Sequence, residues 1–98
     1  MAELIDLGGG RWRLEGDVTF HTVPALAAAG RRMIQPHRDI WLDLASLGQT
    51  GSVALALFLD WQAAAEQVEA RLHLQHCPLA LQRIAGLSHI VELLNFSS

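Results

Sequence analysis

Apolar and polar residues alternate near the start of the chain in a way that predicts a β-hairpin. In residues 11–15, Trp12 and Leu14 fall on one face of an extended strand and charged side chains fall on the other. Residues 3–7 alternate more weakly, and three glycines at 8–10 join the two runs. Two short alternating runs joined by glycines are typical of a hairpin with a flexible turn.

Two later runs predict further strands. Residues 39–44 are apolar enough for a buried central strand and too few for a helix. Residues 71–76 alternate, with Leu72 and Leu74 between polar neighbours. A connection rich in Gly, Ser and Thr, residues 45–51, follows the central strand and leads into a long Ala/Leu segment.

Apolar residues at helical spacing predict four helices. Thr22, Ser52 and Ser88 each precede such a segment and are suitable N-cap residues. Pro24 suits a first helical turn, and Pro36 stops the first helix. The predicted helices cover residues 23–35, 53–70, 78–86 and 89–94.

The order of these elements predicts an α/β fold. Strands that alternate with helices favour parallel neighbours joined by right-handed crossovers, and the leading hairpin makes the sheet mixed. We expect a small mixed sheet of about four strands flanked by about four helices. The 98 residues show no internal repeat or linker, so residues 1–98 are expected to form a single domain.

Charge and composition exclude several classes of partner. The net charge is −3 and the seven cations are scattered arginines, which argues against nucleic acid. The longest apolar run, residues 53–59, has seven residues, whereas a membrane span needs about 20. The first residues do not resemble a secretory signal, and a lone Cys77 favours a reducing compartment. We therefore expect a cytoplasmic protein.

The second predicted helix raises the question of what covers it. Its first half, residues 53–59, is apolar around most of its circumference, and only 17% of the chain is charged. A helix of this kind is either deeply buried or covered by another chain. Because a domain this small has few elements to wrap it, we expect a partner chain at this helix start or at the neighbouring face of the first helix.

His73, His76 and Cys77 are the first candidates for a metal site. On a strand, His73 and His76 point to opposite faces, and no second cluster of ligands exists in the sequence. We therefore expect no metal and no cofactor.

Isolated Asp, His and Ser residues leave a small hydrolase as one alternative. No nucleophile motif surrounds Ser52, so its expected role on physical grounds is to cap a helix. Asp43, at the end of the central strand, is expected to bind N–H groups of the following loop. Neither residue by itself indicates catalysis.

Several segments resemble the STAS domain family. Asp43-Leu44, the loop residue Leu47 and a hydroxyl at Ser52 match the family signature of a strand, a loop and a helix start. Leu14-Glu-Gly-Asp-Val18 is similar to the second strand of the family. Residues 55–61 and 77–88 resemble most closely the branch formed by the small STAS subunit of bacterial Mla-type phospholipid ABC transporters.

This resemblance implies a non-enzymatic cytoplasmic accessory subunit. It would bind the ATPase subunit of a phospholipid-trafficking ABC transporter, support its assembly or activity in maintaining outer-membrane lipid asymmetry, and reach the inner membrane only through that complex. The resemblance implies a contact surface of Phe20, Thr22 and Val23 on one side and Thr50, Gly51, Ser52 and Val53 on the other.

The same surface also serves a second type of STAS protein, the anti-sigma-factor antagonist, which is the alternative function. In members of the family that are switched by phosphorylation, the hydroxyl at the position of Ser52 is the modified group. Gly51 stands here where the family has an acidic residue, which weighs against phosphorylation of Ser52. Thr50 carries a neighbouring hydroxyl and is the alternative phosphorylation site.

Overall fold

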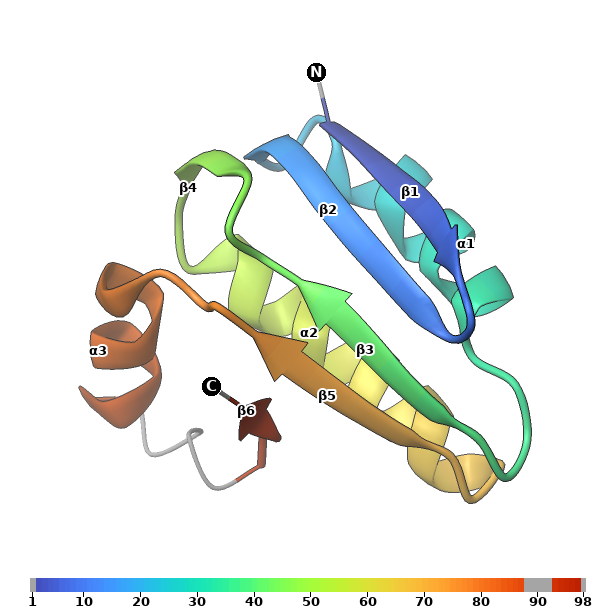
Figure 1. Cartoon of the computed structure of the whole chain (residues 1–98). Helices are drawn as coiled ribbons and strands as arrows, with labels where there is room; N and C mark the ends of the chain where they lie inside the picture. The colour runs from blue at the N-terminus through green and yellow to red at the C-terminus, as the bar shows by residue number, and fades with distance from the viewer. Residues whose placement is uncertain (1, 88–92, 98) are drawn as a thin grey trace.

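One mixed β-sheet is the framework of the protein, and the computed structural model describes it for residues 2–87 and 93–97. The sheet order is β1-β2-β3-β5-β6, with β4 paired to the far end of β2 (Figure 1). β1 and β2 form the predicted antiparallel hairpin, and the other pairs are parallel. The strands are β1 (Ala2–Gly8), β2 (Arg11–Val18), β3 (Asp39–Asp43), β4 (Leu47–Thr50), β5 (Arg71–Gln75) and β6 (Phe96–Ser97).

The α/β fold with a mixed sheet is confirmed, but the number of strands differs from the prediction. The described residues form six strands, not about four. β4 lies inside the connection predicted at 45–51, and β6 has only two residues. β2 also continues to Val18, three residues past its predicted end, because Gly16 adopts a φ of 92° and lets the strand run on.

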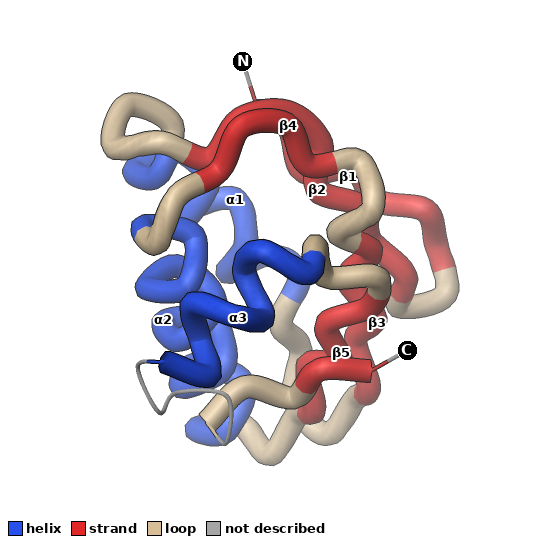
Figure 2. Tube along the Cα trace, turned by 90° about the vertical axis from the view of Figure 1, so that its left-hand side faces the viewer, coloured by secondary structure: helices blue, strands red, loops and turns tan. Residues whose placement is uncertain are grey.

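Three helices are described: α1 (Val23–Met33), α2 (Val53–Gln67) and α3 (Leu79–Leu87). α1 and α2 lie side by side on one face of the sheet (Figure 2). In the predicted fourth helix, residues 88–92 lie outside the described residues, and Leu93 and Leu94 form a turn and a bend. None of the described helices combines the length and the apolar character needed to cross a bilayer.

α2 ends three residues before its predicted end. Glu69 takes a left-handed φ of 57°, and the N–H of Ala70 donates to the carbonyl of Ala65 at 2.9 Å. This pattern, in which a left-handed residue lets the chain close back on the last turn, terminates helices efficiently. The chain then continues directly into β5, which begins at Arg71.

The domain itself buries the apolar first half of α2. Leu55, Leu57 and Phe58 are at most 2% exposed, and Trp61 is fully buried. α1 and the sheet therefore cover most of this stretch, but Val53 at its start is only half-buried, so the expected partner contact at the helix start or at the neighbouring face of α1 stays a prediction. On α1 the buried face is formed by Leu26, Gly30 and Met33, which recur at helical spacing.

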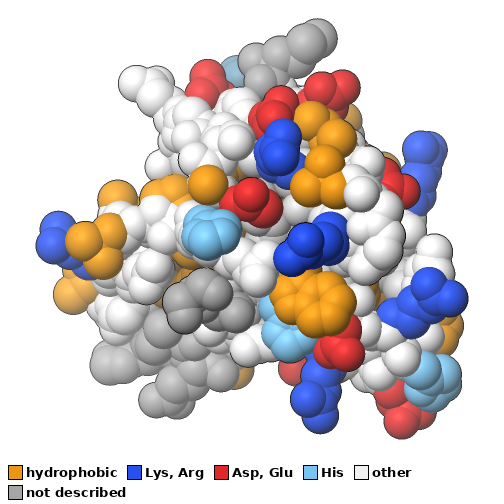
Figure 3. Space-filling view, viewed as in Figure 1, with side chains coloured by type: hydrophobic (Ala, Val, Ile, Leu, Met, Phe, Trp, Pro, Cys, Tyr) orange, Lys and Arg blue, Asp and Glu red, His pale blue; other side chains and the backbone are white. Residues whose placement is uncertain are grey.

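The opposite face of the sheet carries polar and aromatic side chains. Along β3, Ile40 and Leu42 are buried on the helix side, while Asp39, Trp41 and Asp43 alternate with them. Figure 3 views this face and shows charged and His side chains interspersed with apolar ones. The main core therefore lies between the sheet and the helices.

Candidate functional site

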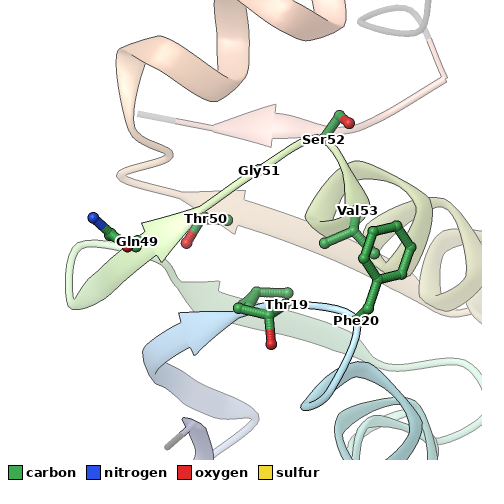
Figure 4. A pocket seen from close by; sticks show the side chains of 8 residues that line it. Thr19, Phe20, Gln49, Thr50, Gly51, Ser52 and Val53 are labelled. Carbon is green, nitrogen blue, oxygen red and sulfur yellow. The ribbon is translucent and has the colours of Figure 1, made fainter.

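A depression of about 520 Å³ lies where β2 and β4 end and the chain enters α1 and α2 (Figure 4). Val18 at the end of β2 pairs in parallel with Thr50 at the end of β4. Each strand is followed by a short connection to a helix, so both connections meet at the same edge of the sheet. The depression is lined by Val18, Thr19, Phe20, Gln49, Thr50, Gly51, Ser52 and Val53.

The structure brings together most of the residues that the sequence predicted as a contact surface. Phe20 comes from the connection before α1, and Thr50 to Val53 come from the connection before α2. We call the eight lining residues the docking surface. Thr22 and Val23, also predicted, do not line it.

Phe20 is the most prominent apolar group of the docking surface, with 83% of its area exposed. The turn around it is held by hydroxyl groups. The N–H of Thr19 donates to Oγ1 of Thr22 at 2.9 Å, and that hydroxyl donates to the carbonyl of Asp17 at 3.0 Å. Thr22 therefore fixes the turn. The sequence predicted that its side chain would cap α1, but the side chain makes no capping hydrogen bond.

Ser52 occupies the N-cap position of α2, but its side chain makes no capping hydrogen bond. A capping hydroxyl folds back onto the helix when the residue has extended backbone angles. Ser52 has φ −60° and ψ −17°, which are helical values, so the predicted cap is wrong. Its hydroxyl is exposed and points away from Phe20 in Figure 4.

Thr50 and Ser52 differ in how accessible their hydroxyls are. The hydroxyl of Thr50 donates to the carbonyl of Gly48 at 3.1 Å and its residue is half-buried. Ser52 is exposed. Of the two candidate modification sites, Ser52 is the more accessible one.

No charged side chain lines the docking surface. The first turns of α1 and α2 also contain no acidic residue, so no carboxylate there offsets the partial positive charge of the helix starts. The lining contains no His, Asp, Glu or Cys to act as a general base for a hydroxyl nucleophile. The arrangement is suited to contact with another surface by apolar packing and neutral hydrogen bonds.

Sequence reasoning missed Val18, Thr19 and Gln49 as lining residues. Gln49 belongs to β4, a strand that no alternation in the sequence signalled. The clear alternation in the sequence stops at residue 15, so the end of β2 was placed too early. The family resemblance indicated Phe20 and Ser52 because it rests on matching sequence positions. It could do so without any knowledge of which strands pair.

The candidate metal ligands do not converge. Nε2 of His73 lies 3.0 Å from Oδ1 of Asp39, and Nδ1 lies 3.1 Å from the side-chain nitrogen of Asn95. Its ring also stacks on Trp41, with ring centroids 5.2 Å apart. His76 is exposed. Within residues 2–87 and 93–97, no three His, Cys, Asp or Glu side chains gather as metal ligands would.

Cys77 and Asp43 have surroundings that indicate a structural role. Burial of Cys77 raises the pKa of its thiol to about 11, which keeps it in the unreactive protonated form near neutral pH. Oδ1 of Asp43 accepts a hydrogen bond from the N–H of Ala45 at 2.9 Å. Asp43 thus ends its strand by binding a loop N–H, as predicted.

A family model described as "Mlab, STAS domain" matches residues 5–95. The chain belongs to the STAS domain family. No curated protein matches this STAS domain significantly.

Solved structures of STAS proteins share the fold. The anti-sigma-factor antagonist SpoIIAA in its unphosphorylated form has a TM-score of 0.73 and 16% identity, covering 100% of this chain and 89% of its own. An anti-sigma-factor antagonist (STAS) domain protein from Planctomyces limnophilus has a TM-score of 0.72 and 13% identity. The match covers 99% of this chain and 90% of that protein. An anti-sigma-factor antagonist from Mycobacterium paratuberculosis has a TM-score of 0.69 and 20% identity. The match covers 98% of this chain and 83% of that protein.

Proposed function

We propose that this STAS domain is a non-enzymatic accessory subunit that binds the ATPase subunit of a phospholipid-trafficking ABC transporter. It supports the assembly or activity of that ATPase, and so outer-membrane lipid asymmetry, and reaches the inner membrane only through the complex. The match to the MlaB-type STAS model supports this choice of partner. The docking surface is the proposed contact.

The observation that carries the proposal is the exposure of Phe20. An aromatic side chain that is 83% exposed beside a depression without charged lining is a natural anchor for another protein. Such residues, buried against a partner pocket, contribute a large share of binding energy at interfaces. The neutral lining also lets the partner cover the surface without desolvating a charge.

The sequence supports a role without nucleotide hydrolysis by this chain itself. It contains no lysine, so it has no Gly-x-x-x-x-Gly-Lys-[Ser/Thr] loop for a nucleotide phosphate. In this proposal the hydrolysis belongs to the ATPase subunit, and the STAS domain acts by contact. Turnover of ATP by the isolated chain above a buffer blank would overturn the accessory role.

Binding of purified ATPase subunit to wild type and to Phe20→Ala tests the proposal. The variant should weaken binding roughly tenfold or more, because the anchor is removed. Leu79→Ala is the matched control, since Leu79 is 60% exposed but does not line the docking surface. No binding by the wild type, or equal losses for both variants, would contradict the proposal.

The exposed hydroxyl of Ser52 favours a second candidate, an anti-sigma-factor antagonist controlled by a protein kinase. The fold is compatible with it, and the hydroxyl is accessible to a kinase active site. A pull-down from cell extract followed by mass spectrometry separates the two. Recovery of transporter subunits supports the accessory role, and recovery of an anti-sigma factor supports the alternative.

A further inference from the structure

β2 and β4 pair through a bulge, and Asp17 lies at its centre. Gly16 pairs with Leu47 and Val18 pairs with Thr50, so the single residue Asp17 faces both Gly48 and Gln49. A bulge leaves one residue without its regular ladder partner and changes the direction of the strand. The bulged segment leads directly into the docking surface, because Gln49 and Thr50 line it.

The side chain of Asp17 supplies the missing partner. Its Oδ1 accepts a hydrogen bond from the N–H of Gln49 at 2.7 Å. Gly48 is the neighbour that allows this contact, since a Cβ at position 48 would collide with the same carboxylate oxygen. The carboxylate therefore fits against the bulge only because residue 48 has no side chain.

The backbone of Asp17 holds the other wall of the depression. Its carbonyl accepts the hydroxyl hydrogen of Thr22 at 3.0 Å, and Oγ1 of Thr22 accepts the N–H of Thr19 at 2.9 Å. Thr19 and Thr22 flank Phe20 in the turn before α1. One residue thus contacts both connections: the Phe20 turn through its carbonyl, and β4 through its carboxylate.

We propose that Asp17 is the positioning residue of the docking surface, which its carboxylate assembles by holding the bulged strand β4 against the Phe20 turn. This inference rests on the proposed function, because it assigns a role within the same contact. Asp17 does not line the depression and is not expected to touch the partner. Its effect passes through Gln49 and Thr50.

Amide hydrogen exchange of the free protein tests the link directly. In Asp17→Ala the N–H of Gln49 loses a charged acceptor and should exchange about tenfold faster or more. Asp17→Asn keeps a side-chain oxygen and should restore most of the protection. Asp6→Ala is the matched control, because Oδ1 of Asp6 accepts a local hydrogen bond from the N–H of Gly8 at 2.8 Å, in the distant hairpin turn.

The collision at Gly48 gives a second, independent test. Gly48→Ala should expel the carboxylate and reproduce the exchange of Asp17→Ala. In the double variant the methyl group at 48 has no carboxylate to meet, so Gly48→Ala should add no further change. Additive effects of the two substitutions would overturn the proposed contact.

Binding of the ATPase subunit to the same folded variants completes the experiment. Asp17→Ala should weaken binding about tenfold while Asp17→Asn and Asp6→Ala stay close to wild type. Faster exchange at Gln49 with unchanged binding would overturn the positioning role, and so would unchanged exchange. Absence of binding by the wild type would instead contradict the proposed function, whereas the exchange results decide the link between Asp17 and Gln49 by themselves.

Discussion

The indole of Trp61 on α2 occupies the space in which a side chain at Gly30 of α1 would begin. A Cβ at position 30 would collide with Cε2, Nε1 and Cζ2 of that ring. Nε1 of Trp61 donates to the carbonyl of Ala27 at 3.4 Å, one turn earlier on α1. The two helices approach closely at this point because a glycine and a tryptophan face each other.

Gly30→Ala should destabilise the protein by about 1–3 kcal/mol, because Trp61 is fully buried and has no room to retreat. In an exposed helix the same substitution stabilises by about 1 kcal/mol. Gly86→Ala in α3 is the control, since no described atom lies within 4 Å of a Cβ built there. Urea unfolding of both variants should therefore give opposite signs, and stabilisation by Gly30→Ala would contradict the packing.

Ser52→Ala should change the free energy of unfolding by no more than about 0.5 kcal/mol, because the hydroxyl makes no capping bond. Ser52→Asp should also fold well, since a carboxylate suits the start of α2. It should nevertheless bind the ATPase subunit poorly, because the partner would desolvate that charge. Thermal unfolding beside a binding assay checks both parts, and equal binding by wild type and Ser52→Asp would exclude Ser52 from the contact.

The unfolding free energy should fall as pH rises from about 9.0 to about 11. Burial raises the pKa of Cys77 from 9.0 to about 11, so in this range the unfolded chain releases a proton that the folded chain retains. Because the unfolded state then binds fewer protons, stability falls with pH. The sequence contains no lysine or tyrosine, so other side chains add little titration in this range.

Urea unfolding between these pH values measures the effect, and Cys77→Ala is the control. The variant should lose the slope even if its stability at neutral pH differs from that of the wild type. An identical slope in both proteins would assign the pH dependence to another group.

His73→Phe should loosen the C-terminal strand. The phenyl ring can still stack on Trp41, but the contacts of the imidazole with Asp39 and Asn95 are lost. The N–H of Leu74, which donates to the carbonyl of Asn95 at 2.9 Å, should then exchange several-fold faster. Asn95→Ala should have a similar effect, and the double variant should add little. Unchanged exchange in His73→Phe would show that the strand pairing alone holds this segment.

The parts of the fold that the sequence predicted are those set by local patterns. The hairpin over residues 3–15 follows from alternation and the glycine turn, and the buried face of α1 follows from helical spacing. β4 was missed because its four residues include Gly48 and Gln49, both exposed, and its pairing with β2 is a long-range contact. No periodicity within the segment signals such a strand.

The candidate site was predicted only in part, for a similar reason. Phe20 and Thr50 to Val53 were found through the family resemblance, and the fold brings them together. The cap at Ser52 was predicted from residue type, but capping depends on backbone angles that a sequence does not reveal. The role of Asp17 was missed because its partner, the N–H of Gln49, lies 32 residues away in the sequence.

The parallel pairing of β2 with β4 has a consequence for the order in which the molecule folds. The β1–β2 hairpin is the one antiparallel pair in the described part of the chain, and it closes through three glycines. Each of the parallel pairs must first close a long loop, which slows its formation. We therefore expect the surface that joins Phe20 to Ser52 to form later than the hairpin. A nascent chain can therefore present this surface only after β4 and the start of α2 have been synthesised.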